Sequence, residues 1–276
     1  MTDPLISTEE LAGRLGEPDL RLVDGSWHLD GRDPRPDFEA GRLPGAVLLD
    51  LEASSDPDSP LPHMLPSAEA FGRRMGQLGL SETDSIVVYY TVGLRSAPRV
   101  WWMLKAMGAR DVRVLDGGLP RWRAEGLPIG KGPVEPPAPA RFRASLDGSA
   151  VADLDAVRAG LSEGVSVIVA RAAERFRGAA PEPRAGLRSG HMPGALNLPF
   201  AGVLRPDGRM KSAEDLRAAF AAAGADLETP ITTTCGSGVT AAILSLALAR
   251  LGVGSRVYDG SWTEWGGRAD TPVETG

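Results

Sequence analysis

Gly41-Arg42-Leu43-Pro44-Gly45-Ala46 in the first half of the chain is matched by Gly190-His191-Met192-Pro193-Gly194-Ala195 in the second half. Four further pairs of segments match at a similar spacing: Leu22–Trp27 with Val167–Arg171, Pro66–Phe71 with Lys211–Leu216, Ile86–Tyr90 with Pro230–Thr234, and Val114–Gly118 with Val257–Ser261. The offset is about 145 residues, which indicates a duplicated domain rather than a short-period solenoid. With 276 residues, the chain has room for two hydrophobic cores. The sequence therefore predicts two copies of one fold.

Each copy alternates short β-branched runs with helical stretches. Helices are expected over Ser67–Leu78, Ser96–Met107, Ser212–Ala223 and Thr240–Leu251. This alternation is typical of an α/β fold with a mostly parallel sheet flanked by helices. Between the copies, prolines at 133, 136, 137 and 139 predict an extended connector. We expect domains over residues 1–130 and 151–276, joined by a proline-rich linker over residues 131–150.

Composition narrows the class of protein. The single cysteine excludes an intramolecular disulfide, and with only three histidines no cysteine and histidine metal cluster is expected. The start, Met1-Thr2-Asp3-Pro4, lacks a basic and apolar signal, so a cytoplasmic location is expected. The apolar stretch Ala241–Leu251 is too short for a membrane span. A net charge of -6 argues against nucleic acid as the main partner.

The single cysteine, Cys235, occupies the junction between a strand ending at Thr234 and a helix beginning near Thr240. The glycines at 236 and 238 allow successive N–H groups of the loop to converge, and the helix N-terminus adds partial positive charge. Such surroundings lower the pKa of a thiol from about 8.5 and favour the thiolate nucleophile. A lone cysteine is more often a small buried apolar residue, but the flanking glycines favour the reactive role.

The first copy has no thiol at the corresponding place. Aligning Ser96-Ala97 with Thr240-Ala241 puts Thr91 opposite Cys235. A threonine hydroxyl without an adjacent base is a poor nucleophile. We therefore expect an inactive first domain and a catalytic second domain.

These motifs together resemble those of the tandem rhodanese-like sulfurtransferases. The resemblance spans essentially the whole chain and rests on the Gly190–Ala195 motif, the loop from Cys235 to Thr240, and the segments Ser96–Trp102, Leu115–Gly118 and Tyr258–Trp262. A Cys-Gly-Ser-Gly-Val-Thr loop is similar to that of 3-mercaptopyruvate sulfurtransferases, whereas thiosulfate enzymes typically have a more basic loop. The resemblance thus implies 3-mercaptopyruvate as the sulfur donor.

The resemblance also implies the site residues. Cys235 is the expected nucleophile, and Gly236, Gly238, Val239 and Thr240 line the loop that binds the substrate. Arg175 and Arg184 match the two substrate-binding arginines of the family, although solvated or salt-bridged arginines are the commoner case. Ser237, His63 and Glu52 match a proposed relay of serine, histidine and acid. The family more often has aspartate at the acid position, so Asp50 is an alternative to Glu52, and His63 is equally compatible with a loop histidine that binds backbone.

The expected reaction moves sulfane sulfur from 3-mercaptopyruvate through a Cys235 persulfide to a thiol, thioredoxin-like or cyanide acceptor and releases pyruvate. No metal or organic cofactor is expected. The alternatives are a thiosulfate sulfurtransferase and a non-catalytic sulfur-carrying interaction module. A cysteine phosphatase or arsenate reductase would need an arginine directly after the loop, where this chain has Ala241.

Overall fold

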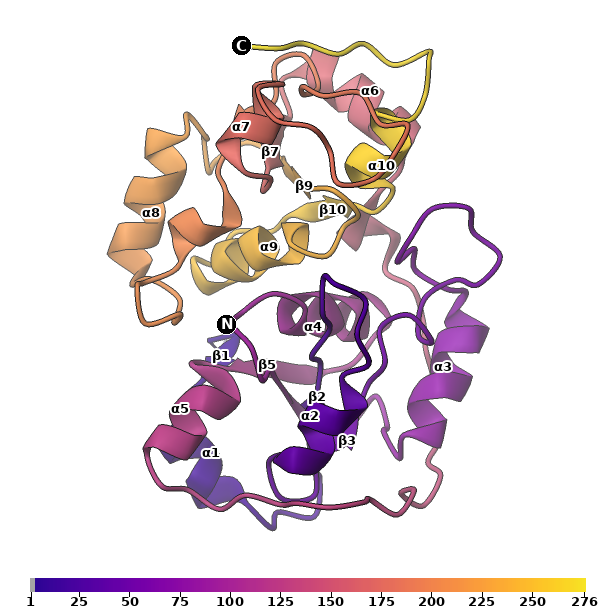
Figure 1. Ribbon diagram of the computed structural model, residues 1–276, viewed down its shortest axis with the longest axis vertical. Helices are drawn as coiled ribbons and strands as arrows, with labels where there is room; N and C mark the ends of the chain where they lie inside the picture. Colours follow the sequence, from indigo (N-terminus) through magenta and orange to yellow (C-terminus); the bar gives the residue numbers. More distant parts are fainter. Residues whose placement is uncertain (1–2) are drawn as a thin grey trace. The chain divides into compact units, whose positions relative to one another are not determined.

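The computed structural model describes residues 3–276, which form two compact units (Figure 1). Unit 1 holds the described residues up to Pro57 together with Leu65–Asp147 and Asp207–Arg209. Unit 2 holds Gly148–Pro206, Met210–Gly276 and the short segment Asp58–Met64 from the first half of the sequence. Unit 2 therefore includes His63, although this residue precedes it by far in the chain. The domain limits expected from the sequence stay a prediction.

Unit 1 is built on a five-stranded sheet with the order β1-β5-β4-β2-β3, and every neighbouring pair is parallel. Its strands are β1 (Leu5–Ile6), β2 (Leu20–Asp24), β3 (Val47–Leu48), β4 (Ser85–Tyr89) and β5 (Asp111–Leu115). Its helices are α1 (Thr8–Arg14), α2 (Arg35–Ala40), α3 (Ala68–Gln77), α4 (Ala97–Ala106) and α5 (Gly118–Ala124). Parallel strands need crossover helices, which cover the sheet with apolar side chains.

Unit 2 repeats this architecture with the order β6-β10-β9-β7-β8, again parallel throughout. Its strands are β6 (Val151–Ala152), β7 (Ser166–Val169), β8 (Leu196–Asn197), β9 (Ile231–Thr234) and β10 (Arg256–Tyr258). Its helices are α6 (Leu154–Glu163), α7 (Ala173–Phe176), α8 (Ala213–Ala222), α9 (Ala241–Arg250) and α10 (Ser261–Trp265), with short 3-10 turns η1 (Gly148–Ala150) and η2 (Phe200–Val203). The prediction of two α/β copies is confirmed.

The strand register corrects one detail of the sequence alignment between the copies. In unit 1 Asp24 pairs with Tyr89, and in unit 2 Val169 pairs with Thr234. Tyr90, which follows Tyr89, is therefore the structural counterpart of Cys235, and the placement of Thr91 opposite Cys235 was wrong. The loop of unit 1 is one residue longer, and an alignment anchored on the helix start alone shifts the position that follows the strand.

Matched helices of the two units begin on matched serines. Ser67 Oγ accepts a hydrogen bond from the amide of Ala70 (3.2 Å) at the start of α3, and Ser212 Oγ accepts one from the amide of Asp215 (3.1 Å) at the start of α8. Such caps satisfy amides that the first helical turn leaves without a partner. The structure thus confirms these helix starts to within one residue of their predicted positions.

Helix α9 explains the longest apolar stretch of the chain. Its residues from Ala241 to Leu248 are buried in unit 2, and the helix packs on β9 and β10. A helix that is apolar on all sides belongs in a protein core or a membrane, and here it lies in a core. Within residues 3–276, every helix falls short of the length and apolarity that crossing a bilayer requires.

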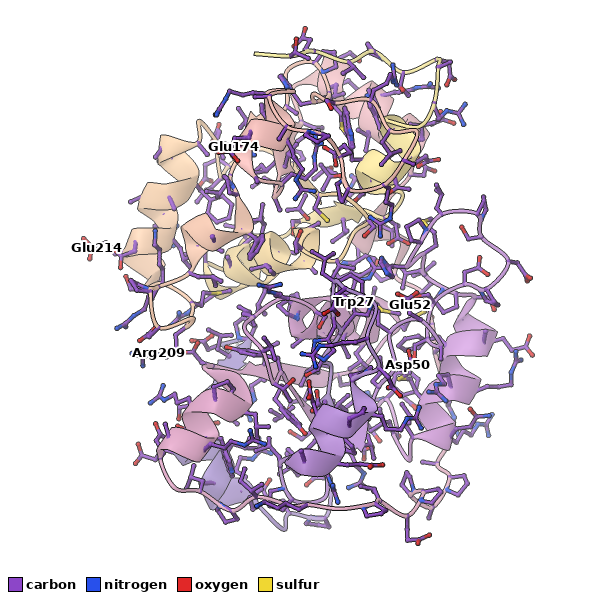
Figure 2. All side chains as sticks on the ribbon, in the orientation of Figure 1. Trp27, Asp50, Glu52, Glu174, Arg209 and Glu214 are labelled. Carbon is purple, nitrogen blue, oxygen red and sulfur yellow. The ribbon has the colours of Figure 1, made fainter. Side chains whose placement is uncertain are left out.

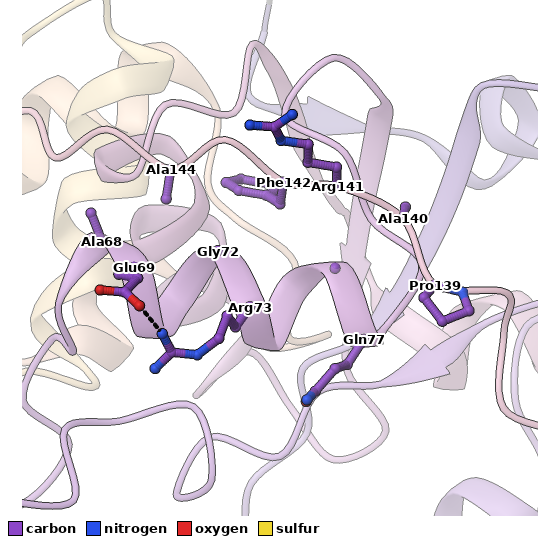
Figure 3. Close-up of a pocket in the computed structure, with 11 residues that line it drawn as sticks. Ala68, Glu69, Gly72, Arg73, Gln77, Pro139, Ala140, Arg141, Phe142 and Ala144 are labelled. Carbon is purple, nitrogen blue, oxygen red and sulfur yellow. Dashed lines mark hydrogen bonds and ion pairs between the residues drawn. The ribbon is translucent and has the colours of Figure 1, made fainter.

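The proline-rich connector has no helix or strand over residues 131–147, and its later part packs on α3 (Figure 3). Two helix positions without a Cβ atom permit this close approach. A Cβ added to Gly72 would lie 2.7 Å from the carbonyl oxygen of Phe142, and one added to Gly76 would lie 2.5 Å from that of Ala140. The Ala140 amide also donates to the carbonyl of Gly76 (2.9 Å). The connector up to Asp147 is therefore part of unit 1.

Candidate active site

Cys235 directly follows β9, which pairs with β10 on one side and β7 on the other (Figure 1). The thiol is free, and the residue is only 3% exposed. The loop from Gly236 to Thr240 then leads into α9. In open parallel sheets, ligands bind beyond the carboxyl ends of the strands. The fold therefore puts the one cysteine where such a sheet binds ligands.

The backbone of this loop is held by the N-terminal turn of α10. The carbonyl oxygens of Cys235 and Gly236 accept hydrogen bonds from the amides of Trp262 (3.1 Å) and Thr263 (2.9 Å). The hydroxyl of Thr263 also donates to the carbonyl of Gly236 (2.6 Å). Gly238 has φ +77°, in the left-handed region that glycine adopts readily. These contacts fix the loop from its carbonyl side.

The amides of the same loop remain available to a ligand. No residue in the described range 3–276 accepts a hydrogen bond from the backbone N–H groups of residues 236–240. Successive N–H groups without protein acceptors, next to a helix N-terminus, form a binding concavity for an anion. The loop thus has the free amides that a cradle for a thiolate or a persulfide requires, and its role as that cradle stays a prediction.

His63 and Ser237 meet in unit 2. His63 Nδ1 lies 3.0 Å from Ser237 Oγ, and the imidazole is buried. His63 also has φ 60°, a backbone conformation that costs energy for a residue with a Cβ atom. The structure thus joins two of the three predicted relay members, and it does so through the segment Asp58–Met64.

The structure shows one hydrogen bond of the predicted acid, Glu52. Glu52 belongs to unit 1, and its Oε1 accepts a hydrogen bond from Trp27 Nε1 (2.9 Å) (Figure 2). Asp50, the alternative acid, accepts a hydrogen bond from the amide of Ala53 (3.2 Å) at its Oδ1. The acid of the relay therefore stays a prediction.

The two predicted substrate arginines lie on either side of an acidic residue in the sequence. Arg175 lies in α7, and its Nη1 is 3.6 Å from Glu182 Oε2. Arg184 is half-buried, and its guanidinium forms no hydrogen bond or ion pair with any residue of the described range. A half-buried guanidinium without a protein partner is suited to bind a carboxylate.

Sequence reasoning missed a buried ion pair beside these arginines. Arg171 and Glu182 form an ion pair whose side chains are almost fully buried. Arg171 also donates to the carbonyl of Gly190 and lies 4.1 Å from the centre of the Trp262 ring. Burial lowers the pKa of the Arg171 guanidinium, while the negative charges of Glu182 and of the Cys235 thiolate raise it. The signal in the sequence was an arginine just beyond the end of β7, the strand beside β9.

Comparison with known proteins places the chain in a family. The model of the rhodanese-like domain matches residues 7–125 and again residues 153–268. The chain belongs to the rhodanese-like family. Each matched region contains four of the five strands of its sheet, because β1 and β6 lie just before the matched residues. Cys235 lies in the second matched region.

Relatives of the chain are sulfurtransferases. The chain is 42% identical to the 3-mercaptopyruvate sulfurtransferase of Escherichia coli K12, over 98% of this chain and 97% of the relative. It is 44% identical to the human 3-mercaptopyruvate sulfurtransferase, over 94% and 88% of the two chains. It is also 43% identical to the thiosulfate sulfurtransferase of Rattus norvegicus, over 98% and 94%.

A solved structure has the same fold over nearly the full length of the chain. The crystal structure of SseA from Escherichia coli, a 3-mercaptopyruvate sulfotransferase with the rhodanese fold, superimposes with a TM-score of 0.86 at 38% sequence identity. The match covers 95% of this chain and 99% of that chain. The fold assigned from the repeat is thereby confirmed.

Proposed function

We propose that this chain is a sulfurtransferase that moves sulfane sulfur from 3-mercaptopyruvate through a persulfide on Cys235 to a thiol, a thioredoxin-like protein or cyanide. One observation carries the proposal: the only thiol of the chain follows β9 and opens a loop whose amides have no acceptor in the described protein. A thiolate and a persulfide are both anionic sulfur species that such a cradle stabilises.

The first half-reaction forms the persulfide. The Cys235 thiolate attacks the sulfur of 3-mercaptopyruvate, and an S–S bond forms as the C–S bond breaks. The electron pair of that bond passes to pyruvate as its enolate, which takes a proton on the methylene carbon. The pair of His63 and Ser237, 3.0 Å apart, supplies or relays this proton.

The second half-reaction returns the thiol. An acceptor thiolate or cyanide attacks the outer sulfur of the persulfide, and the S–S bond to Cys235 breaks, with the electron pair returning to Cys235 as thiolate. The two half-reactions together return Cys235 to its starting thiolate, so a full turnover leaves the protein neither oxidised nor reduced. The chemistry requires no metal or organic cofactor.

The charge of the loop favours mercaptopyruvate over thiosulfate. Residues 235–240 carry no charged side chain, whereas a dianionic thiosulfate would be stabilised by cations beside the accepting sulfur. The carboxylate and ketone of mercaptopyruvate lie away from its sulfur, and Arg175 and Arg184 supply the cations for them. Thiosulfate is the second candidate donor, because a relative of nearly equal identity is named thiosulfate sulfurtransferase.

The decisive experiment weighs the intact protein after incubation with each donor. We expect 3-mercaptopyruvate to add one sulfur, roughly 32 Da, which an excess of thiol then removes. Cys235→Ser should fold normally, gain no mass and release no pyruvate. Full turnover by this variant would refute the proposal, and a gain in mass from thiosulfate alone, with release of sulfite, would assign the other donor. Failure of every small donor to load Cys235 would favour the non-catalytic module.

Two further parts of the proposal concern the whole chain. We assign catalysis to the second rhodanese-like domain and an inactive role to the first, with limits at residues 1–130 and 151–276 and a linker between them. Tyr90 at the position of Cys235 supports this division, because a phenol cannot form a persulfide. A cytoplasmic location, without nucleic acid or membrane partners, is also proposed.

A further inference from the structure

Ser261, the first residue of α10, has a backbone conformation that is unusual for a residue with a side chain. Its φ is 49°, and the residue is fully buried. In the described range, His63 and Ser261 are the two non-glycine residues with positive φ. One contacts Ser237 and the other contacts Cys235. Strained residues persist where the surroundings hold them, and they gather at functional sites.

The hydroxyl of Ser261 links the catalytic loop to β10. Ser261 Oγ accepts hydrogen bonds from the amide of Cys235 (3.3 Å) and from Thr234 Oγ1 (3.2 Å), and it donates to the carbonyl of Tyr258 (2.8 Å). A serine hydroxyl has one donor and two acceptor sites, so all three are used. The Cys235 amide is therefore bonded to Ser261 and is not one of the free amides of the cradle. The Ser261 hydroxyl holds the amide of Cys235, and the Trp262 amide holds its carbonyl.

The first rhodanese-like domain shows what the backbone alone requires at this position. Gly118 is the counterpart of Ser261 and has a similar φ of 57°. The Leu119 amide donates to the carbonyl of Tyr90 (2.8 Å), as the Trp262 amide does to that of Cys235. A Cβ added to Gly118 would lie 2.6 Å from the Tyr90 ring. A glycine can therefore form this turn without any side-chain hydrogen bond, because glycine adopts positive φ without steric cost.

We propose that Ser261 is a positioning residue for Cys235. Its hydroxyl holds the Cys235 peptide so that the free amides of residues 236–240 face the sulfur, and this contribution explains why a strained serine stands where the backbone favours glycine. The inference rests on the proposed role of Cys235 as nucleophile. Ser261 acts through the Cys235 peptide rather than through a contact with substrate.

Two variants separate the hydroxyl from the backbone strain. Ser261→Gly removes the hydroxyl and relieves the strain, whereas Ser261→Ala removes the hydroxyl and keeps the strain. Ser245→Ala is the matched control, because the hydroxyl of the buried Ser245 forms hydrogen bonds with Thr233 Oγ1 (2.9 Å) and Ser255 Oγ (3.0 Å) in the same unit and with no residue of the loop 235–240. The thermal midpoint of each variant is measured alongside activity.

The main measurement is the rate at which iodoacetamide alkylates Cys235 as a function of pH. The chain has one cysteine, so every alkylation event reports this residue. Charged and titratable groups near it include Arg171 and Arg175 with their shared partner Glu182, and His63 through Ser237. The buried Asp259 lies two residues before Ser261 in the chain. All of them are unchanged in the variants. A shifted profile therefore reports the loop and its cradle.

We expect both Ser261 variants to move the alkylation midpoint to higher pH and to lower kcat for 3-mercaptopyruvate by about tenfold, the effect of one hydrogen bond, with little change in KM. Ser261→Gly should do so with a thermal midpoint at or above that of Ser261→Ala. Ser245→Ala should leave the alkylation profile and kcat unchanged.

Two outcomes would overturn the inference. The first is a wild-type alkylation profile and wild-type kcat in Ser261→Gly. The second is an equal loss in Ser261→Ala and Ser245→Ala that follows the thermal midpoint. Absence of turnover in the unmodified protein would instead refute the proposed function, while the alkylation profile would still decide whether Ser261 positions the thiol.

Discussion

Arg175 and Arg184 are the same residue type and have the same predicted role, but their surroundings differ. Both were expected to bind the donor from their match to the family, and the structure adds that their surroundings differ. Arg175 shares the carboxylate of Glu182 with the buried Arg171, whereas the guanidinium of Arg184 has no partner in the described chain. Glu182 itself escaped sequence reasoning, because nothing in a lone glutamate between prolines indicates that it will be buried against an arginine.

The contrast between the two arginines predicts separable effects. Arg184→Ala should raise KM for 3-mercaptopyruvate by about tenfold or more and leave the free energy of unfolding unchanged, because a charge-assisted hydrogen bond to substrate is lost and no protein contact is. Arg175→Ala should raise KM and also lower stability slightly. Steady-state kinetics and urea unfolding measure both quantities.

Arg177, which is exposed on the same short stretch, offers the control. Arg177→Ala should leave KM and stability as they are. An equal rise of KM in Arg177→Ala and Arg184→Ala would show that the site responds only to net charge.

Among the elements, helices were the most predictable part of the chain and their contacts the least. The serine caps and apolar periodicity of α3 and α8 follow from local sequence, and so does the absence of helix in the proline-rich connector. That the connector lies along α3 does not follow from local sequence. It depends on the glycines of α3, which in an isolated helix would simply be unfavourable residues.

Replacing Gly72 tests this packing. Alanine normally stabilises a helix relative to glycine by about 1 kcal/mol, but in Gly72→Ala the new Cβ meets the carbonyl oxygen of Phe142. We expect the free energy of unfolding to fall by about 1–3 kcal/mol, as in other overpacked sites. Urea denaturation followed by circular dichroism measures the change.

Gly13 in α1 is the matched control, since a Cβ there would meet no atom within 4 Å. Gly13→Ala should be neutral or stabilising by up to about 1 kcal/mol. Stabilisation of both variants to the same extent would mean that the connector does not pack on α3.

The molecule as a whole joins distant parts of its sequence in unit 2. The segment Asp58–Met64 belongs to unit 2, although the residues before and after it in the chain belong to unit 1. It brings His63 within hydrogen-bond distance of Ser237, which lies 174 residues later in the sequence. The proposed active site therefore includes a residue from the first half of the chain, although the proposed nucleophile, Cys235, belongs to the second rhodanese-like domain.

A double-mutant cycle tests whether His63 and Ser237 act together. His63→Asn keeps a residue type that tolerates positive φ, and Ser237→Ala removes the hydroxyl. Each variant should lower kcat by about tenfold. The double variant should be no slower than either single one, because the effects of substitutions at interacting residues do not add. Pyruvate release provides the rate.

His28 is a buried histidine of unit 1 and provides the control. His28→Asn should leave kcat unchanged. Strictly additive losses in the double variant would show that the two side chains act independently.

The duplication, the α/β class, the helix starts and the position of the proposed nucleophile could be predicted from the amino-acid sequence, because they depend on residue type and on short spacings. The folded chain was needed to show which residue of the first copy corresponds to Cys235, which partners Arg171 and Glu182 have, and how Ser261 and His63 contact the loop. Strand register and contacts between distant segments arise when the whole sheet and its helices pack together, and no local pattern encodes the distance between two side chains that meet only in the folded chain.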